Sequence, residues 1–548
     1  TYSGGFYLGM WSNTGTATSL LKTANGNISI TGTGTGATNN RGIIFCCNAT
    51  KPFTVEATGT GSISLTGSGS TQDLILFGAH NILAASGSIN LTGSGAGPLN
   101  TDTAVTTIGY KAGSDVTSST SNITITDDSL SLAAGKGLQV NTAGKVTVQP
   151  YGNNFSSPMT YPINDFVISS NVSGLTIGKD IGSTAHTDTV TMGGATSIAG
   201  PINVYAGNIN LGAGLSSTGA SSGISLYATS NINTTAAGLT VQTAGGNILF
   251  NANVTGTGGS IDLDRLTVLS NGGNITLGGG LNGTDYAVGM ATSTMPTYVG
   301  QSKYKGVFLQ GVTLNASGTT SGGNISIKGK GWQGANWNDL VTDYYAIGVD
   351  MVGYTAGTTL VTNNSGNIVV NGVGGINYDD TTHSVGINFY NGAGITANSI
   401  STVNGSVSLS GTAGTGLSRI KAGIATDGGT ANVYSTSGAV NVTGIATSTI
   451  SGLLNNGGTI NIGSNGTTTT SGTVTLASDV LTFTLGTTNV SGTGGLVVKP
   501  VTTGTTIGVG TGAGTLSLAS SWFTGTSVFK NGFSSIVLGA SDAGNITV

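Results

Sequence analysis

Ionisable side chains are scarce in this sequence. Its 548 residues include only 16 Lys and Arg and 20 Asp and Glu, and Glu56 is the single glutamate. Ordinary globular chains are roughly 25% charged, and soluble helices depend on Glu, Lys, Ala and Leu, so an all-α or α/β fold has little support. The chain has a net charge of −4 and lacks the dense Lys/Arg patches of nucleic-acid-binding proteins. We therefore expect no nucleic-acid partner.

Proline, cysteine and long apolar runs are sparse as well. With only 8 prolines and irregularly spaced glycines, the chain cannot form a collagen triple helix. No run approaches the ~18 apolar residues of a membrane-spanning helix. The two cysteines, Cys46 and Cys47, are too few for a disulfide framework or a four-ligand zinc site. Because neighbouring strand residues point to opposite faces, we favour small buried apolar side chains over a strained vicinal disulfide.

Glycine is abundant, and it punctuates a short repeated motif. There are 95 glycines, about one residue in six, and 37% of the residues are hydrophobic, which excludes the composition of a disordered chain. The motif consists of Gly, then Asn or Ser, then apolar, polar and apolar residues. Copies begin at Gly26, Gly61, Gly87, Gly207, Gly246, Gly273, Gly323, Gly366, Gly405 and Gly544. The alternation predicts a half-buried strand, and glycine predicts the turn beside it.

The spacing of the motif predicts a solenoid. Leu239 and Leu266 are 27 residues apart, as are Ile248 and Ile275, and each interval holds three short apolar runs. We infer three strands per coil and a minimal coil of about 27 residues. Longer intervals place their extra residues between the first strand and a second strand, for which we take residues 286–289 as one example. Insertions at one corner of a repeated coil are typical of solenoids, so we predict an all-β, parallel β-helix (β-solenoid).

Stacked coils would also explain the composition. Equivalent side chains of neighbouring coils lie ~4.8 Å apart, where like charges repel each other. Thr, Ser, Val and Ile fit a pleated, half-buried surface. Aligned Asn amides can hydrogen-bond along a ladder, and we expect the glycines at corners with positive φ.

The motif recurs along almost the whole chain and is joined by the stretches 174–179, 200–209 and 532–539. In these features the sequence resembles the bacterial filamentous-haemagglutinin-like exoproteins, the β-helical passengers of two-partner secretion and large autotransporters. The resemblance implies a right-handed parallel β-helix, export through an outer-membrane transporter, and an adhesive or matrix-building role outside the cell. The family has no shared catalytic residues to carry over. Its Asn-Pro-containing secretion signature is not found here, which leaves the secretion route open.

The repeat covers the chain from end to end. We therefore predict one continuous β-solenoid shaft over residues 1–548, with a sub-region at 281–400 that carries the longest insertions. The sequence begins at Thr1 without an initiator Met and ends on residues 544–548, which is how a repeat opens. We expect the chain to be a fragment of a longer polypeptide.

Aromatic residues gather in the insertion-rich sub-region. Eight of the 16 tyrosines lie between Tyr286 and Tyr390. Exposed rings beside Asn and Asp suit sugar stacking or a protein contact, so we take six residues as candidate contacts to a partner or glycan. They are Trp332, Trp337, Asp339, Tyr344, Tyr345 and Tyr378. The alternative, which we favour, is that these rings pack the insertions onto the wall of the helix.

The sequence holds parts of a catalytic constellation but no complete one. Polygalacturonases, which are similar in fold, use Asn-Thr-Asp, an Asp pair, Gly-His-Gly and Arg-Ile-Lys. Residues 100–102, 127–128 and 419–421 match three of these, and no Gly-His-Gly occurs. Carboxylates that act as acid and base lie within about 5–10 Å of each other, whereas Arg419 is many coils away from Asp128 on a solenoid. We interpret the matches as chance.

The histidines give no sign of a metal site. His80, His186 and His383 fall in different predicted coils. His383 follows Asp379 and Asp380 in an insertion, but three ligands at this spacing match no known metal motif. We interpret this segment as a solvated turn and expect no cofactor and no metal.

These observations predict a non-enzymatic structural or adhesive shaft of a bacterial cell-surface or secreted filamentous exoprotein. The expected partners are a host or neighbouring cell surface, a glycan or matrix, and other copies of the chain in a filament. The alternative is a polysaccharide-binding or polysaccharide-cleaving β-helix, which would need two or three clustered carboxylates. A third hypothesis is ice binding, which would need a flat face of aligned threonines without insertions.

Overall fold

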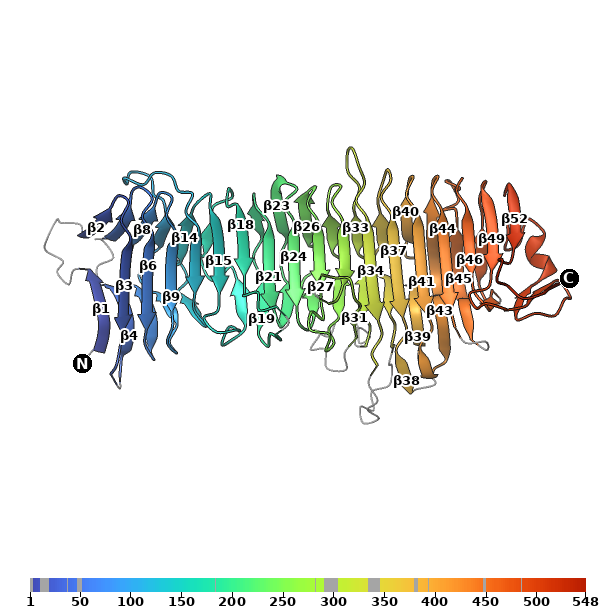
Figure 1. Ribbon diagram of the computed structural model, residues 1–548, viewed down its shortest axis with the longest axis horizontal. Coiled ribbons are helices and arrows are strands. Elements are labelled where there is room, and N and C mark those ends of the chain that lie inside the picture. Colours follow the sequence, from blue (N-terminus) through green and yellow to red (C-terminus); the bar gives the residue numbers. More distant parts are fainter. Residues whose placement is uncertain are drawn as a thin grey trace. The chain divides into compact units, whose positions relative to one another are not determined.

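The computed structural model describes residues 3–9, 19–36, 38–46, 52–182, 184–280, 282–289, 304–333, 345–378, 383–392, 394–446, 450–483 and 485–548. Within these ranges the secondary structure is β-strand apart from one short 3₁₀ helix, η1 (Ser520–Phe523). The chain divides into two compact units, unit 1 (Thr1–Tyr227) and unit 2 (Ala228–Val548), and each is described by itself. In both units parallel strands stack in register (Figure 1), which confirms the predicted β-helix.

Unit 1 consists mainly of three parallel sheets, one for each strand of a coil. The first sheet contains β3 (Ile28–Thr33), β6 (Ile63–Ser68), β9 (Ile89–Gly93), β12 (Ile123–Thr126), β15 (Lys145–Gln149), β18 (Gly174–Ile177) and β21 (Ile202–Ala206). The second contains β1 (Ser3–Gly9), β4 (Asn40–Cys46), β7 (Gln72–Leu76), β10 (Leu99–Thr101) and β13 (Leu130–Leu132). The third contains β2 (Ser19–Thr23), β5 (Phe53–Ala57), β8 (Asn81–Ala84), β11 (Thr106–Gly109), β14 (Leu138–Asn141) and β17 (Val167–Ile168). Its later coils use β16 (Met159–Tyr161), β19 (Thr189–Met192), β20 (Thr196–Ile198), β22 (Asn208–Leu211) and β23 (Leu215–Ala220), and β24 (Ile224–Ala228) spans the boundary between the units.

Unit 2 repeats this plan. Its first strands are β27 (Ile248–Asn251), β30 (Ile275–Gly278), β34 (Ile325–Lys330), β37 (Ile368–Val373), β41 (Val407–Thr412), β44 (Val440–Ile445), β46 (Val474–Ala477), β49 (Gly495–Lys499) and β52 (Ser535–Leu538). Its second strands are β25 (Ile232–Thr234), β28 (Ile261–Asp264), β32 (Val307–Gln310), β35 (Val349–Gly353), β39 (His383–Asn391), β43 (Ile420–Ser435), β45 (Ser451–Ile462) and β47 (Leu481–Thr482). Its third strands are β26 (Thr240–Ala244), β29 (Thr267–Leu269), β33 (Thr313–Asn315), β36 (Thr359–Val361), β40 (Asn398–Thr402), the later parts of β43 and β45, and β48 (Thr487–Val490). Short strands outside this plan are β31 (Ala287–Val288), β38 (Ile376–Tyr378), β42 (Thr415–Leu417), β50 (Ile507–Val509), β51 (Leu516–Leu518) and β53 (Ile546–Thr547).

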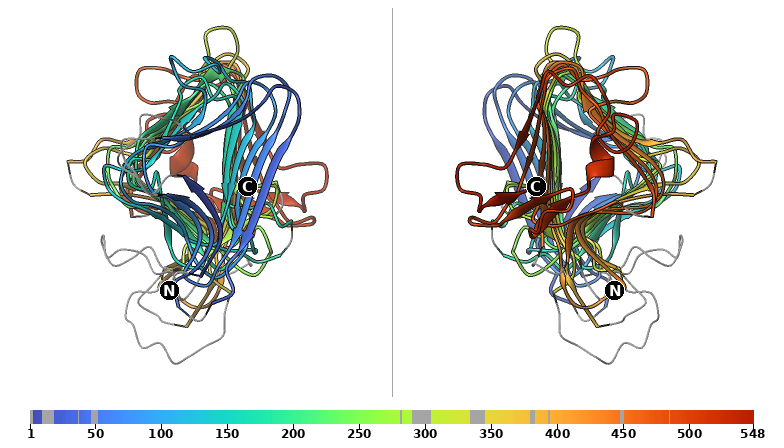
Figure 2. Two further views of the ribbon diagram at one scale, coloured as in Figure 1. Left: turned by 90° about the vertical axis from the view of Figure 1, so that its left-hand side faces the viewer. Right: turned by 90° about the vertical axis from the view of Figure 1, so that its right-hand side faces the viewer.

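The core of each unit is the interior that the coils surround, which the end-on views display (Figure 2). Along the first sheet of unit 1, Ile63 pairs with Ile89 and Ile89 with Ile123, and all three side chains are fully buried. The intervening residues are only partly buried, as the alternation predicts. Because burying one such aliphatic side chain contributes about 1.5–3 kcal/mol, the core ladder stabilises every coil through its neighbours.

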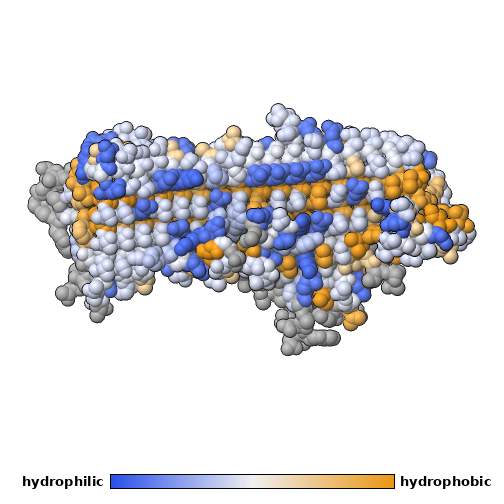
Figure 3. Space-filling model, viewed as in Figure 1, coloured by the Kyte–Doolittle hydropathy of each residue, from blue (hydrophilic) through white to orange (hydrophobic). Residues whose placement is uncertain are grey.

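Polar residues also stack in rows across successive coils, visible as bands of like hydropathy in Figure 3. The Asn of the repeated motif caps the next coil: the amide oxygen of Asn274 accepts a hydrogen bond from the backbone N–H of Asn324 at 2.8 Å, and Asn324 does the same for Asn367. On the third sheet, amides bond directly, with Asn489 Nδ2 donating to Asn461 Oδ1 at 2.8 Å. The predicted Asn ladder is therefore confirmed, with backbone N–H groups as additional donors.

The motif glycines are required by close approach of the backbones. A Cβ on Gly87 would overlap the carbonyl oxygen of Gly61, and a Cβ on Gly323 would overlap that of Gly273. Gly87 and Gly323 are absent from the positions with positive φ. Our expectation of positive φ is wrong at these positions. Glycine is needed there because one coil lies against the carbonyl of the next.

Coil length varies, and most of the variation lies at one corner. The predicted 27-residue offset recurs between Ile248 and Ile275, while the register pairs of first strands range from Val474↔Leu496 to Ile275↔Ile325. The long coils add residues between the first and second strands, as predicted. Residues 286–289 are a correction, because β31 pairs with the end of β34, and β32 forms the second strand of that coil.

Two further predictions bear on chemistry and location. Cys46, at the end of β4, is buried and disulfide-bonded, so our preference for a buried thiol is wrong for this residue. Cys47, the other cysteine of the chain, lies outside the described residues. In the part of the chain that the structure describes, no helix has the length and apolar character needed to cross a membrane.

Candidate functional site

The predicted contact residues have different fates. Trp332 is half-buried and packs edge-to-face on Tyr304, with ring centroids 5.6 Å apart. Tyr345 packs on a buried apolar cluster that includes Ile347 and Val385. Tyr378 is the last residue of β38, and the structure does not describe its side chain. Trp337, Asp339 and Tyr344 lie outside the described residues.

Trp332 and Tyr345 therefore contact other parts of the chain, as in the packing alternative. Tyr345 also lines a cleft of about 550 Å³ in unit 2, which is within the range of ligand sites. The binding role of the six predicted residues stays a prediction, and the cleft gives it a defined location.

The cleft spans several coils and lies beside the corner that carries the insertions. Strand register places Phe308 of β32 beside Asp350 of β35, and Asp350 beside Asn388 of β39. All three side chains line the cleft. Residues at the starts of β39 and β43, where the insertions rejoin the coil, form another part of its lining.

A buried ion pair forms the floor of the cleft. Lys305 Nζ lies 2.5 Å from Asp350 Oδ2, and each side chain is only 3% exposed. Asn388 Nδ2 donates to Asp350 Oδ1 at 2.9 Å, so both carboxylate oxygens have a partner. The Lys305 ammonium also lies 4.1 Å from the centroid of the Phe308 ring, a favourable cation–π contact. Such complete pairing is what permits two charges to be buried.

A second polar group lies around His383. Its Nε2 is 3.5 Å from Asp427 Oδ2, and its ring packs on Tyr345 with centroids 4.7 Å apart. Asn456 Nδ2 donates to Asp427 Oδ1 at 2.8 Å. Burial lowers the pKa of the His383 imidazole below its ordinary value of 6.5. Nearby carboxylates raise this pKa and nearby cations lower it, with a net lowering, so the imidazole is neutral at pH 7.

The aromatic part of the cleft lining is more open. Tyr354, just after β35, is 40% exposed, and Tyr390 of β39 is 44% exposed. The Arg265 guanidinium lies 4.9 Å from the centroid of the Tyr354 ring and bonds to Asp264 at 2.6 Å. One face of Tyr354 is therefore held by a cation that is itself paired, while the exposed part of the ring remains accessible.

The charges of the described cleft lining balance. Lys305 and Arg419 are its cations, and Asp350 and Asp427 are its carboxylates. Asp350 is occupied by Lys305 and Asn388, which leaves Asp427 as the one carboxylate with exposed oxygens. Glycoside hydrolysis commonly uses two carboxyl groups, one of which donates a proton. The described arrangement supplies hydrogen bonds and stacking surfaces, which suit binding.

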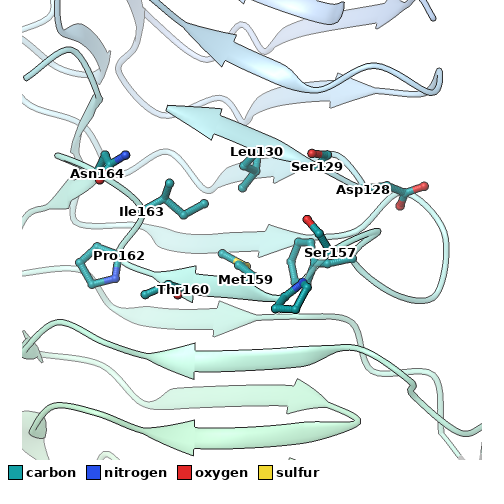
Figure 4. Close-up of a pocket in the computed structure, with 11 residues that line it drawn as sticks. Asp128, Ser129, Leu130, Ser157, Met159, Thr160, Pro162, Ile163 and Asn164 are labelled. Atoms are coloured by element: carbon teal, nitrogen blue, oxygen red, sulfur yellow. The ribbon is translucent and has the colours of Figure 1, made fainter. Parts of the chain in front are cut away.

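A smaller pocket of about 280 Å³ lies in unit 1 between β13 and β16. Figure 4 places Asp128 and Ser157 at one end and Pro162 and Asn164 at the other. Asp128 is the one charged residue in its lining, and Asp128 Oδ1 accepts a hydrogen bond from the Gly152 N–H at 2.7 Å. This carboxylate therefore caps a turn, and the pocket offers less chemistry than the cleft of unit 2.

The remaining sequence motifs do not assemble into one site. Asp102 and Asp128 belong to unit 1, whereas Arg419 belongs to unit 2. Among the described residues, no three His, Cys, Asp or Glu side chains are grouped so that they could hold a metal ion. Asp379 and Asp380 lie outside the described residues, so the predicted solvated turn stays a prediction.

Sequence reasoning missed most of the cleft. It selected Tyr345 but neither the ion pair of Lys305 with Asp350 nor the exposed Tyr354 and Tyr390. Aligning the second strands coil by coil would have placed Phe308, Asp350 and Asn388 at one position. A charged residue on a buried strand is a signal that a partner must lie nearby.

Comparison with known proteins adds no relative. No protein-family model matches the sequence, and neither a curated protein nor a solved structure matches the chain.

Proposed function

We propose that this chain is the non-enzymatic structural and adhesive shaft of a bacterial cell-surface or secreted exoprotein of the filamentous-haemagglutinin-like type. The observation that carries the proposal is the stacking itself. Parallel strands pair with their equivalents in the next coil, and core, Asn and glycine rows repeat with them. A fold of this kind presents loops on one face of a stiff support.

An extracellular location is supported by Cys46. It is disulfide-bonded, and disulfides persist mainly in oxidising compartments. The proposed route outward uses an outer-membrane transporter. The proposed partners are a host or neighbouring cell surface, a glycan or matrix, and further copies of the chain.

A polysaccharide-cleaving function is the second candidate, because Asp350 and Asp427 line one cleft with His383. The pairing of Asp350 with Lys305 favours binding without cleavage. Incubation of the protein with neutral and acidic polysaccharides, followed by a reducing-end assay, separates the two. We expect no release of reducing ends. Release that Asp427→Asn abolishes would replace the structural proposal with an enzymatic one.

The location is tested on intact cells of the source organism. An antibody against this chain should label their surface or detect the protein in the medium, and deletion of the coding segment should reduce attachment of the cells to a surface or to each other. Confinement of the protein to the cytosol, or unchanged attachment, would contradict the proposal.

A further inference from the structure

We propose that the cleft of unit 2 binds an uncharged oligosaccharide, with Tyr354 and Tyr390 as stacking platforms and Asp427 as the main hydrogen-bond acceptor. This inference rests on the adhesive part of the proposed function, because it names the ligand of the face that would make contact. Four observations of the cleft carry it: its exposed rings, its accessible carboxylate, its charge balance and its length.

The exposed rings are the first observation. Tyr354 and Tyr390 are 40% and 44% exposed, and both line a concave site. Val352 pairs with Tyr390 in register, so the two tyrosines come from neighbouring coils. A tyrosine ring offers a flat apolar face with a polar tip, which matches the C–H face and hydroxyl rim of a pyranose. Gly428 lies against Tyr390: a Cβ there would approach the ring to 3.6 Å, so a larger side chain would cover it.

The accessible carboxylate is the second observation. An ionised carboxylate can accept about four hydrogen bonds. Asp427 Oδ1 accepts one from Asn456, and Oδ2 lies 3.5 Å from His383, a distance too long for a strong hydrogen bond. The side chain is 26% exposed. Asp427 can therefore accept hydrogen bonds from ligand hydroxyls, and the exposed Arg419 can donate to them.

Charge balance is the third observation, and it selects the ligand class. The described lining has two cations and two carboxylates, and the buried pair of Lys305 with Asp350 is already satisfied. The remaining carboxylate, Asp427, would repel a uronate or a sulfated sugar at close range. An uncharged sugar has no such penalty.

The length of the cleft is the fourth observation. Its lining extends from β35 through β39 and β43 to Asn456 of β45. Three strand spacings at ~4.8 Å cover about 14 Å, which accommodates an oligosaccharide rather than a single sugar. We infer that the sugar chain runs across the strands, from Tyr354 toward Asp427.

The test is a binding measurement with the full chain. Oligosaccharides of uncharged hexoses and pentoses and, separately, oligogalacturonate are titrated calorimetrically against the wild type and against Tyr390→Ala, Tyr354→Ala and Asp427→Asn. Tyr151→Ala, a change at a 50% exposed tyrosine of unit 1, is the matched control, and circular dichroism checks that every variant is folded. We expect binding of at least one uncharged oligosaccharide, weakened at least tenfold by Tyr390→Ala and by Asp427→Asn, and unchanged by Tyr151→Ala.

Three results would overturn the inference: binding of no oligosaccharide, preferential binding of oligogalacturonate, or uncharged-sugar binding that neither tyrosine variant in the cleft weakens. The outcome is separable from that of the proposed function. A surface-located protein without sugar binding would reject only the ligand. Sugar binding by a cytosolic protein would reject the extracellular role.

Discussion

Unit 1 and unit 2 each bury an aspartate, but they stabilise it in opposite ways. In unit 2, Asp350 has a buried cation, Lys305, at 2.5 Å. In unit 1, Asp127 is 1% exposed, and its Oδ2 has no hydrogen-bond partner among the described residues. A Cβ on Gly93 would overlap this oxygen and lie 2.9 Å from Asp73 Oδ2, so two carboxylates face each other across the glycine.

The two aspartates therefore differ in charge state. Burial, with a smaller effect of Asp73, raises the pKa of Asp127 to about 8, so its carboxyl group is mostly protonated at pH 7. Asp350 is satisfied as an ion by Lys305 and Asn388. The comparison teaches that a solenoid poor in charge can bury a carboxyl group either as a neutral turn-forming acid or as part of a complete ion pair. Only the second leaves a polar floor under a cleft.

The largest expected effect comes from breaking the ion pair. Lys305→Met leaves Asp350 buried without a cation, and loss of one partner of a buried pair costs about 3–5 kcal/mol. Urea unfolding followed by circular dichroism should show a lower midpoint. The double variant Lys305→Met/Asp350→Asn should recover most of the loss, because no uncompensated charge remains. A single variant as stable as wild type would show that Asp350 is not buried as an ion.

The pH dependence of unit 1 provides the next test. Because the pKa of Asp127 is raised from its ordinary 3.8 to about 8, its stabilising contribution is complete below pH 3.8 and is lost as the pH rises toward 8. Asp127→Asn mimics the protonated form. The stability of the variant relative to wild type should therefore increase between pH 4 and pH 8 and level off above it, measured by urea unfolding at each pH. The exposed Asp102 serves as control through Asp102→Asn, and an equal pH profile for both variants would refute the assignment.

A smaller effect is expected from a motif glycine. Gly87→Ala places a methyl group against the carbonyl of Gly61, and overpacking of this kind typically costs about 1–3 kcal/mol. Gly174→Ala is the matched control, since the nearest atoms to a Cβ there lie at 3.5 Å or more. Thermal unfolding of the two variants should differ clearly. Equal melting temperatures would mean that the coils can separate without cost.

The smallest effect is expected from an Asn of the motif. Asn324→Ala removes the acceptor for the Asn367 N–H, and a hydrogen bond of this type contributes about 0.5–1.5 kcal/mol. Ser326→Ala changes a half-buried side chain of the same strand and is the control. Faster amide exchange of Asn367 in Asn324→Ala than in Ser326→Ala is the expected result. Identical exchange would show that water replaces the cap without loss.

Much of the fold could be predicted, because the same residues that form each strand also specify its partner. Ile28, Ile63 and Ile89 occupy the same place in three copies of the motif, and the structure pairs them in this order. The role of the motif glycines was predicted less well. A glycine that permits positive φ and a glycine that permits close backbone approach look alike in a sequence, and only the neighbouring coil distinguishes them.

The candidate site was predicted only in outline. Aromatic enrichment led to the correct stretch of the chain, and Tyr345 lies in the cleft. The pairing of Lys305 with Asp350 crosses 45 positions of sequence, and His383 meets Asp427 across another long interval. Insertions of unequal length separate these residues in the chain, so their spacing carries no regular signal.

The sequence by itself determined the β-helix, because a period-2 pattern with stacked equivalents leaves each strand one favourable partner, its counterpart in the next coil. The tertiary structure decided where charge is tolerated and where a ligand can enter. Those outcomes depend on which side chains of different coils come within a few ångströms of each other, and on whether a buried carboxylate meets a cation or a second carboxylate there.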